Sequence, residues 1–293
     1  MTLLAGEPAT EHQPPRSFGR GLWGAARARV PIWHGLEALP PGRGRCVAVL
    51  GVFDGVHRGH AQLITTAVEL SHARELPAVL VTFDPHPARV VGAPRDTAAL
   101  SSLAQRAEWA GDLGVDAVVV LEFTRELAAL TPEQFSERVL LDALGADAVV
   151  VGANFTFGAR AVGTTSTLRE LGRRHGYSAH PVELLPLSGT TCSSTHIRGC
   201  LSRGDVAGAA LALGRDHEIE TRVVAGHLVT GADTAVPAPG RYVVAIAPED
   251  DEPWLGRTAV LTVDHQRRLL PDPAQDHREG SRVLVTFRAR VAS

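Results

Sequence analysis

This sequence has few cysteines, no long hydrophobic run and no block of basic residues. Its three cysteines, Cys46, Cys192 and Cys200, are odd in number and lack metal-ligand spacing, which favours free thiols in a reducing compartment over a disulfide framework. No apolar stretch approaches the roughly 20 residues of a membrane-spanning helix. The formal net charge is −3, with both signs mixed along the chain, which does not suit binding to a nucleic-acid backbone. We therefore expect a cytoplasmic protein that binds neither a membrane nor a nucleic acid.

Hydrophobic residues make up 44% of the 293 residues, enough for a full core. At roughly 100–200 residues per domain, one large domain and one small one are expected. Residues 1–31 stand apart, because they contain proline, glycine and arginine but no sustained apolar run. Glu7, Glu11 and the missing hydrophobic segment argue against a targeting sequence, so we predict a disordered extension or a misassigned start codon.

Apolar runs of strand length alternate with helical patterns between residues 46 and 184. Strands are expected at 46–52, 77–83, 116–123, 147–151 and 177–184. Helices are expected at 58–75, 100–113, 132–144 and 167–175. Because the strands are almost wholly apolar, both faces of their sheet should be covered, which predicts an α/β fold with a doubly wound parallel sheet. Ligands of such sheets bind beyond the carboxyl ends of the strands.

The pattern changes after residue 213. β-like segments follow at 220–229, 240–247, 258–263 and 282–291, separated by turns rich in proline, glycine and aspartate. Several short strands with turn signals predict a small all-β module. We place the boundary near Asp216, which gives a large domain at 32–216 and a β module at 217–293.

The most informative motif directly follows the first expected strand, where residues 51–60 read Gly-Val-Phe-Asp-Gly-Val-His-Arg-Gly-His. Its glycines allow a tight backbone path and close approach to a ligand. A strand, a tight turn and a helix start form an anion site, since free N–H groups and the helix dipole point to one spot. His57 and His60 add donors for negatively charged oxygens. Two alternatives remain, namely polar residues that only cap a helix, and a metal pair, for which no third ligand is evident.

A second motif, Ser-Ser-Thr-His-Ile-Arg, occupies residues 193–198 at an expected helix start. The hydroxyls of Ser194 and Thr195 can cap that helix and also donate to phosphate oxygens. Arg198 supplies a planar, permanently charged fork that suits a triphosphate. The alternative is an ordinary N-cap with a surface arginine.

A third motif, Gly-Ala-Asn-Phe-Thr-Phe-Gly, follows the fourth expected strand at residues 152–158. Phe155 and Phe157 stand out in a chain with only 5% aromatic residues, and they can flank a planar ring. Asn154 can form a hydrogen bond with the edge of a ligand. The alternative is that at least one of these phenylalanines closes the end of the core.

A fourth motif, Thr-Phe-Asp-Pro-His-Pro, follows the second expected strand at residues 82–87. Its two prolines stiffen a loop. Phe83, Asp84 and His86 are thereby expected at the ligand end of the sheet. Without that position the motif is an ordinary turn.

These four motifs, in this order, resemble the nucleotidyltransferase half of the bacterial bifunctional riboflavin kinase/FMN adenylyltransferases, also called FAD synthetases. The resemblance covers about residues 32–216, including Trp-His-Gly-Leu-Glu at residues 33–37. It implies a fold similar to the nucleotidyltransferases with a His-x-Gly-His motif. It also implies the transfer of AMP from ATP to FMN, which gives FAD and pyrophosphate, with magnesium and without zinc.

The resemblance further implies roles for individual residues. ATP would contact Gly51, Phe53, Asp54, Gly59, Ser194, Thr195 and Arg198. The flavin or the reacting phosphates would lie near Phe83, Asp84, His86, Asn154 and Phe157. The catalytic residues would be His57, His60 and Arg198. We assign His60 to the transition state at the α-phosphate, His57 to a similar or positioning role, and Arg198 to the β- and γ-phosphates; the metal ligands stay unassigned.

The chemistry of this reaction fits the residue types. The attacking phosphate monoester has a second pKa of about 6 and is already mostly ionised at neutral pH, so no strong general base is required. The site must align two anions and neutralise charge on the α-phosphate and the departing pyrophosphate. Hydrogen-bond donors, an arginine and magnesium do this.

The C-terminal part departs from the family pattern. The family's riboflavin kinase barrel carries a Gly-Phe-Pro-Thr-Ala-Asn-like motif, whereas residues 228–236 here read Leu-Val-Thr-Gly-Ala-Asp-Thr-Ala-Val. The tail is also short for that barrel. We therefore predict a degenerate, kinase-like barrel and an FMN adenylyltransferase without riboflavin kinase activity. Two alternatives stay open: a nucleotidyltransferase with another phosphorylated acceptor, and a non-catalytic flavin or nucleotide sensor.

Overall fold

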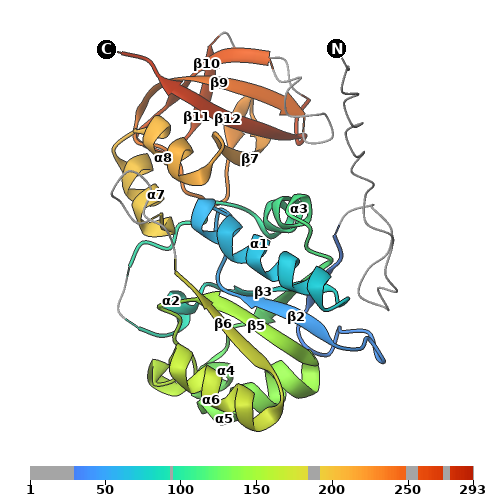
Figure 1. Ribbon diagram of the computed structural model, residues 1–293. Helices are drawn as coiled ribbons and strands as arrows, with labels where there is room; N and C mark the ends of the chain where they lie inside the picture. Colours follow the sequence, from blue (N-terminus) through green and yellow to red (C-terminus); the bar gives the residue numbers. More distant parts are fainter. Residues whose placement is uncertain (1–29, 93–94, 184–191, 249–256, 273–277, 293) are drawn as a thin grey trace, which may run out of the picture.

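The computed structural model describes residues 30–92, 95–183, 192–248, 257–272 and 278–292, which form an α/β unit and a β-barrel (Figure 1). The extension predicted for the N-terminus lies almost wholly outside the described residues, as do the last residue of the strand expected at 177–184 and residues 249–256 between two of the expected β segments. None of the described helices is both long enough and apolar enough to cross a membrane.

The α/β unit is built on a parallel six-stranded sheet, as the apolar strands predicted. Its strands are β1 (Ile32–His34), β2 (Cys46–Leu50), β3 (Ala78–Asp84), β4 (Ala117–Glu122), β5 (Ala146–Gly152) and β6 (Ser178–Val182). Their order across the sheet is β1-β4-β3-β2-β5-β6. All five residues of β2 are buried, as are most of those in β3, β4 and β5, because helices cover both faces.

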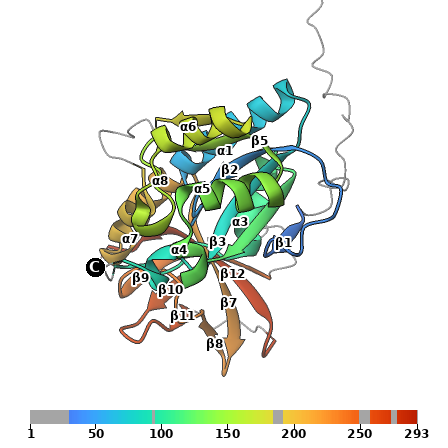
Figure 2. The same cartoon turned by 90° about the horizontal axis from the view of Figure 1, so that it is seen from below.

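Alternate residues of each strand pack into two hydrophobic cores, one on each face of the sheet. In β2, Val47 and Val49 face the core under α1 (Arg58–Ala73) and α3 (Leu103–Asp112). Ala48 and Leu50 face the opposite core, which is covered by α5 (Pro132–Phe135), its π-helical continuation Ser136–Ala143, and α6 (Thr165–His175). Figure 1 shows α1 and α3 on the barrel side of the sheet, and Figure 2 shows α5 and α6 in front of the opposite side.

The strand order reverses at the centre of the sheet. The chain moves outward from β2 through β3 to β4, and it returns to the other side of β2 as β5 and β6. The carboxyl ends of β2 and β5 are therefore neighbours, and such a switch point is where ligands bind in open α/β sheets. The motifs at residues 51–60 and 152–158 follow these two strands. The loop after β3, with its short helix α2 (Pro87–Val90), lies at the same edge.

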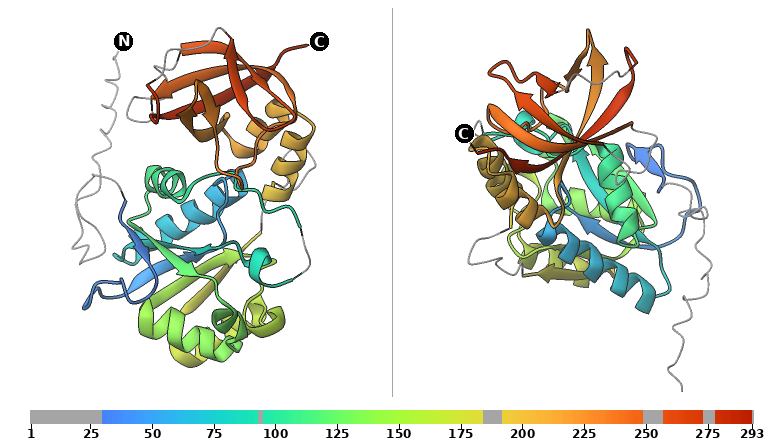
Figure 3. Two further views of the ribbon diagram at one scale, coloured as in Figure 1. Left: turned by 180° about the vertical axis from the view of Figure 1, so that it is seen from behind. Right: turned by 90° about the horizontal axis from the view of Figure 1, so that it is seen from above.

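The C-terminal residues form the predicted all-β module, here a closed antiparallel barrel. Its strands are β7 (His217–Val224), β8 (His227–Val229), β9 (Gly240–Pro248), β10 (Arg257–Val263), β11 (Leu269–Asp272) and β12 (Arg282–Arg290), in the order β10-β11-β8-β7-β12-β9. The barrel shares one hydrophobic core with α7 (Ser194–Ser202) and α8 (Val206–Leu213). Figure 3 shows these two helices packed beside the barrel.

Several elements differ from the sequence-based expectation. The segment at 220–229 is two strands rather than one, because Ala225 and Gly226 both have positive φ (49° and 74°) and turn the chain into a hairpin. The expected helix at 132–144 is α helical only as far as Phe135. β1, α4 (Arg125–Ala129), α8 and β11 were not predicted. Three of them are shorter than six residues, and α8 is apolar around its circumference. None of the four therefore shows a clear hydrophobic periodicity in the sequence.

Candidate active site at the start of two helices

The turn after β2 has a strained backbone. Phe53, Gly55 and Val56 have φ values of 51°, 79° and 35°. A positive φ is rare for a β-branched residue such as valine, and such strain persists only where the surroundings enforce it. Phe53 and Val56 are buried, and Asp54 is 2% exposed, so the packing of these side chains holds the turn in place. Strained turns of this kind cluster at functional sites.

His57 ends the turn and caps α1. Its Nδ1 accepts a hydrogen bond from the backbone N–H of His60 at 3.2 Å, and the two imidazole rings stack with centroids 3.6 Å apart. An accepting Nδ1 places the proton of the neutral ring on Nε2, which leaves an N–H donor. The capping alternative is therefore correct for His57, and it is compatible with a donor role.

Both imidazoles are neutral near pH 7. Burial, followed by the charges of Arg215 and Arg198, lowers the pKa of His57 to about 4. Burial also holds the pKa of His60 well below its usual value, with smaller effects from His57, Arg106 and Arg215. The pair therefore offers hydrogen-bond donors and acceptors rather than positive charge.

The Nδ1 atom of His60 is buried and has no hydrogen-bond partner among the described residues. Its ring also meets the edge of Phe53, with the centroids 5.1 Å apart. Buried polar atoms are nearly always paired in native proteins. A polar atom left without a partner beside a strained turn and a helix start indicates a ligand-binding position.

Asp54 joins the first motif to the second. Its carboxylate lies 2.5 Å from Nη2 of Arg198 and 3.1 Å from Nη2 of Arg106, and it also accepts from the N–H of Leu100 at 2.9 Å. Arg198 donates through Nε to the carbonyl of Ala98 at 2.7 Å. Arg198 is 5% exposed, so it is not the surface arginine of the alternative interpretation. Asp54 therefore holds these two guanidinium groups in place, and it would affect a bound nucleotide only through them.

The helix starts of α1 and α7 lie next to each other. Ser194 donates to the backbone carbonyl of Asp54 at 3.0 Å, while Ser193 caps α7 by accepting from the N–H of His196 at 3.2 Å. A Cβ atom on Gly59 would lie 3.4 Å from the carbonyl of Cys192. Thr195 is exposed in the first turn of α7. Two adjacent sets of free backbone N–H groups favour an extended anion.

The loop after β3 contributes His86. Its Nδ1 accepts from the N–H of Ala88 at 3.1 Å, so its neutral ring also keeps the proton on Nε2. Burial and then the charge of Arg198 lower its pKa to about 4. Asp84 is exposed at the end of β3, whereas Phe83 is buried against Phe123 with ring centroids 5.6 Å apart.

The loop after β5 stands apart from this cluster. Phe157 is buried and packs against Phe135 and Phe155, so it closes the core as the structural alternative stated. Asn154 is exposed and Phe155 is half-buried. Among the described residues, the ring contacts of Phe157 are with Phe135 and Phe155 and not with the histidine pair. Asn154 and Phe157 remain predictions for flavin binding.

Two arginines at the site were missed from the sequence. Arg106 lies on α3 and Arg215 follows α8, about 50 and 160 residues from the turn that they contact. Arg106 also donates to Ser101, and Arg215 donates to the carbonyls of the turn. Neither residue stands in a recognisable motif, so only the folded chain reveals them.

The histidines predict how stability depends on pH. His57 and the barrel residue His217 are buried, and each has a pKa of about 4 in the folded chain, against about 6.5 when unfolded. Only the unfolded state binds their protons between these values. The contribution of these two histidines to the free energy of unfolding should therefore be greatest above pH 6.5 and fall as the pH decreases toward 4.

Urea unfolding at a series of pH values measures this dependence. His217→Gln should make the decline between pH 6.5 and 4 shallower, since it removes one of the depressed groups. His227→Gln, on the exposed side of β8, serves as the control and should leave the slope unchanged. A midpoint that stays constant over this range in the unmodified protein would contradict the assignment of neutral buried imidazoles.

A parallel sheet with two adjoining helix starts, neutral histidines and buried arginines is typical of α/β enzymes that bind phosphates. The model of the FAD synthetase family matches residues 40–196, more than half of the chain, and the chain belongs to this family of nucleotidyltransferases. It is 35% identical over 238 residues to a bifunctional riboflavin kinase/FMN adenylyltransferase of Pseudomonas fluorescens, which covers 78% of this chain and 76% of that protein.

Proteins of the same name from other bacteria match over less of their length. The Escherichia coli K12 protein is 33% identical over 193 residues, which is 66% of this chain but 61% of that protein. The Bacillus subtilis protein is 31% identical over 199 residues, or 67% and 62%. A solved structure titled as a macrolide-efflux protein from Streptococcus pneumoniae has a TM-score of 0.77 at 23% identity, covering 89% of this chain and 91% of that one. That likeness shows the fold alone.

Proposed function

We propose that this chain transfers AMP from ATP to FMN and releases pyrophosphate, which makes it an FMN adenylyltransferase. The observation that carries the proposal is the buried, unpartnered Nδ1 of His60 in the first turn of α1, a helix whose start adjoins that of α7. The family supports the same reaction, since its relatives are named for FMN adenylylation. The buried guanidinium groups of Arg106 and Arg198 outnumber the single carboxylate of Asp54, so the site favours a polyphosphate.

The reaction needs alignment more than proton transfer. An oxygen of the FMN phosphate forms a bond to the α-phosphorus of ATP, and the bond from that phosphorus to the bridging oxygen of pyrophosphate breaks. Backbone N–H groups at the two helix starts hold the ATP phosphates. The neutral rings of His57 and His60 form hydrogen bonds with the α-phosphate, where charge increases in the transition state. Arg198 and Thr195 bind the departing end.

Magnesium fits this site as an ion that would bind together with the triphosphate. No group of three or more His, Cys, Asp or Glu side chains capable of holding a metal is found in the described part of the chain. Asp54 is occupied by Arg198 and Arg106, whereas Asp84 is an exposed carboxylate at the same edge of the sheet. Magnesium in such enzymes commonly binds one or two carboxylates and the substrate phosphates. Asp84 is the side chain that would contact it, and the ion would neutralise phosphate charge.

We propose that the barrel has no riboflavin kinase activity. Residues 228–236 lack the Phe-Pro-Thr-Ala-Asn sequence, and part of this segment packs on the transferase unit. Ala99 donates to the carbonyl of Asp233 at 2.6 Å and accepts from the N–H of Ala235 at 2.8 Å. The barrel therefore supports the loop that binds Asp54 and Arg198, instead of using the segment for a second active site.

One assay tests both proposals. Purified protein with FMN, ATP and magnesium should release pyrophosphate and form FAD in equal amounts. Riboflavin with ATP should give no FMN under the same conditions. Pyrophosphate release with another phosphorylated acceptor but not with FMN would overturn the assigned acceptor. ATP binding without any turnover would favour the sensor alternative, and FMN formation from riboflavin would overturn the loss of kinase activity.

A further inference from the structure

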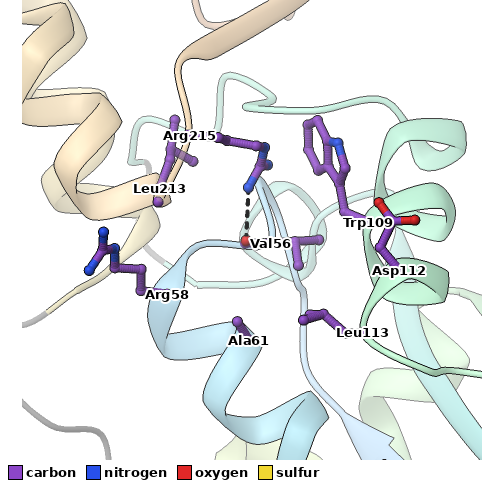
Figure 4. Close-up of a pocket in the computed structure, with 9 residues that line it drawn as sticks. Val56, Arg58, Ala61, Trp109, Asp112, Leu113, Leu213 and Arg215 are labelled. Carbon is purple, nitrogen blue, oxygen red and sulfur yellow. Dashed lines mark hydrogen bonds between the residues drawn. The ribbon is translucent and has the colours of Figure 1, made fainter. Parts of the chain in front are cut away.

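Arg215, in the linker just before the barrel, contacts the strained turn. It follows Gly214, which ends α8, and precedes β7. Its guanidinium lies flat over the ring of Trp109 in α3, with Cζ 3.4 Å from the ring centroid. Figure 4 shows Arg215 pointing from the linker towards Val56, above a cavity of about 390 Å³ between α1 and α3. None of the residues predicted to bind ATP or the flavin lines this cavity.

The hydrogen bonds of Arg215 end on the turn itself. Nη2 donates to the carbonyl of Gly55 at 2.5 Å, and Nη1 donates to the carbonyl of Val56 at 3.1 Å. The Val56 carbonyl belongs to the peptide that leads directly into His57. Both residues have positive φ, a conformation that is rare for valine. A guanidinium can hold two carbonyls in a fixed relation because its N–H groups form a rigid fork.

We infer that Arg215 is a positioning residue of the transferase site, which fixes the peptide before His57 and thereby the stacked pair of His57 and His60. The inference rests on the proposed function, and it gives the linker between α8 and β7 a part in the transferase reaction. Arg215 touches no reacting atom. Displacing the turn by about 1 Å would move two imidazoles at once, and displacements of that size cost up to about a hundredfold in rate.

The charge of Arg215 supplies a second, separable effect. The groups that face the two imidazoles are Arg215 from the linker, Arg198 from α7, Arg106 from α3 and each other's rings. Each arginine disfavours a protonated imidazole. Removing the charge of Arg215 should therefore raise the pKa of His57, while replacing it with another cation should not.

Two substitutions separate geometry from charge. Arg215→Met removes both, while Arg215→Lys keeps a positive charge but cannot hold two carbonyls in a planar fork. For Arg215→Met we expect kcat for FAD formation to fall about 10- to 100-fold, with the KM for ATP within about threefold. For Arg215→Lys we expect a comparable fall in kcat. Arg222→Met, which removes an exposed arginine from β7, should keep the kcat of the unmodified protein.

Imidazole titration by NMR gives a readout that needs no turnover. The His57 signal should titrate at higher pH in Arg215→Met and at its original pH in Arg215→Lys. His180, whose lowered pKa depends on burial, Arg74 and Arg169, should not move in either variant. If the unmodified protein forms no FAD, the proposed function fails, and the titration still tests Arg215. Unchanged kcat in both Arg215→Met and Arg215→Lys would overturn the positioning role, and unchanged titration in Arg215→Met would overturn the effect of its charge.

Discussion

Replacement of His60 by alanine should lower kcat for FAD formation by about 10²–10³-fold, the range seen when one donor is removed from a site that stabilises developing charge. The Nδ1 atom of His60 is buried without a partner among the described residues, and its ring stacks on His57. The substitution removes an interaction with the α-phosphate that strengthens as the pentacoordinate arrangement forms. Interactions made mainly in the transition state affect kcat more than KM.

The control for this experiment lies on the same helix. His72→Ala removes an exposed histidine from the last turn of α1 and should leave kcat unchanged. Circular dichroism and thermal unfolding establish that both variants are folded, since loss of a ring from a partly open site should change Tm by only a few degrees. A His60→Ala variant that keeps at least half of the original kcat would refute the role assigned to this residue.

The second large effect concerns stability. Asp54→Ala should reduce the free energy of unfolding by about 3–5 kcal/mol, because it leaves two buried guanidinium groups without their carboxylate. Asp54 is 2% exposed, and the paired side chains of Arg198 and Arg106 are 5% and 10% exposed. The carboxylate also accepts the N–H of Leu100, so the loop from Ala98 to Ser101 loses an anchor.

A matched surface pair shows whether burial causes this effect. Asp233 forms an ion pair with Arg89 at 2.7 Å, but its side chain is 73% exposed. Asp233→Ala should therefore cost no more than about 1 kcal/mol. Urea unfolding followed by fluorescence measures both variants. Equal losses for Asp54→Ala and Asp233→Ala would show that Asp54 is not the centre that joins the turn, α3 and α7.

Arg198 is expected to contribute both to substrate binding and to the stability of the fold. Its Nη2 binds Asp54 and its Nε binds the carbonyl of Ala98, so Nη1 is the guanidinium nitrogen without a partner among the described residues. A phosphate contact from Arg198 can therefore use Nη1 or the second N–H of Nη2. The prediction that Arg198 binds the β- and γ-phosphates stays open, and any loss of ATP binding in a variant has to be compared with its loss of stability.

The main sheet was predictable because its strands are buried on both faces and read as continuous apolar runs. Residues 46–50, for example, are Cys-Val-Ala-Val-Leu, and all five are buried. The placement of the motifs at residues 51–60, 82–87 and 152–158 followed from the same pattern, since they come at the ends of strands, whereas the motif at 193–198 begins α7. β1 was missed because three residues carry no period, and its place beside β4 depends on pairing with a strand about 86 residues away.

The electrostatic frame of the site could not be read from the sequence. Arg106 and Arg215 reach the turn only through the packing of α3 and of the linker before β7. The burial of Phe157, in the loop after β5, likewise depends on Phe135, which lies in α5. A motif shows which residue types are near a strand end, whereas the fold decides which of them face the ligand and which close the core.

A structure of the protein with a non-hydrolysable ATP analogue would test the central claim most directly. We expect the triphosphate at the helix starts of α1 and α7, with a ring nitrogen of His60 within hydrogen-bond distance of an α-phosphate oxygen and Thr195 near the terminal phosphates. A nucleotide bound elsewhere, such as in the cavity between Arg58 and Trp109, with no contact to His57 or His60, would contradict it.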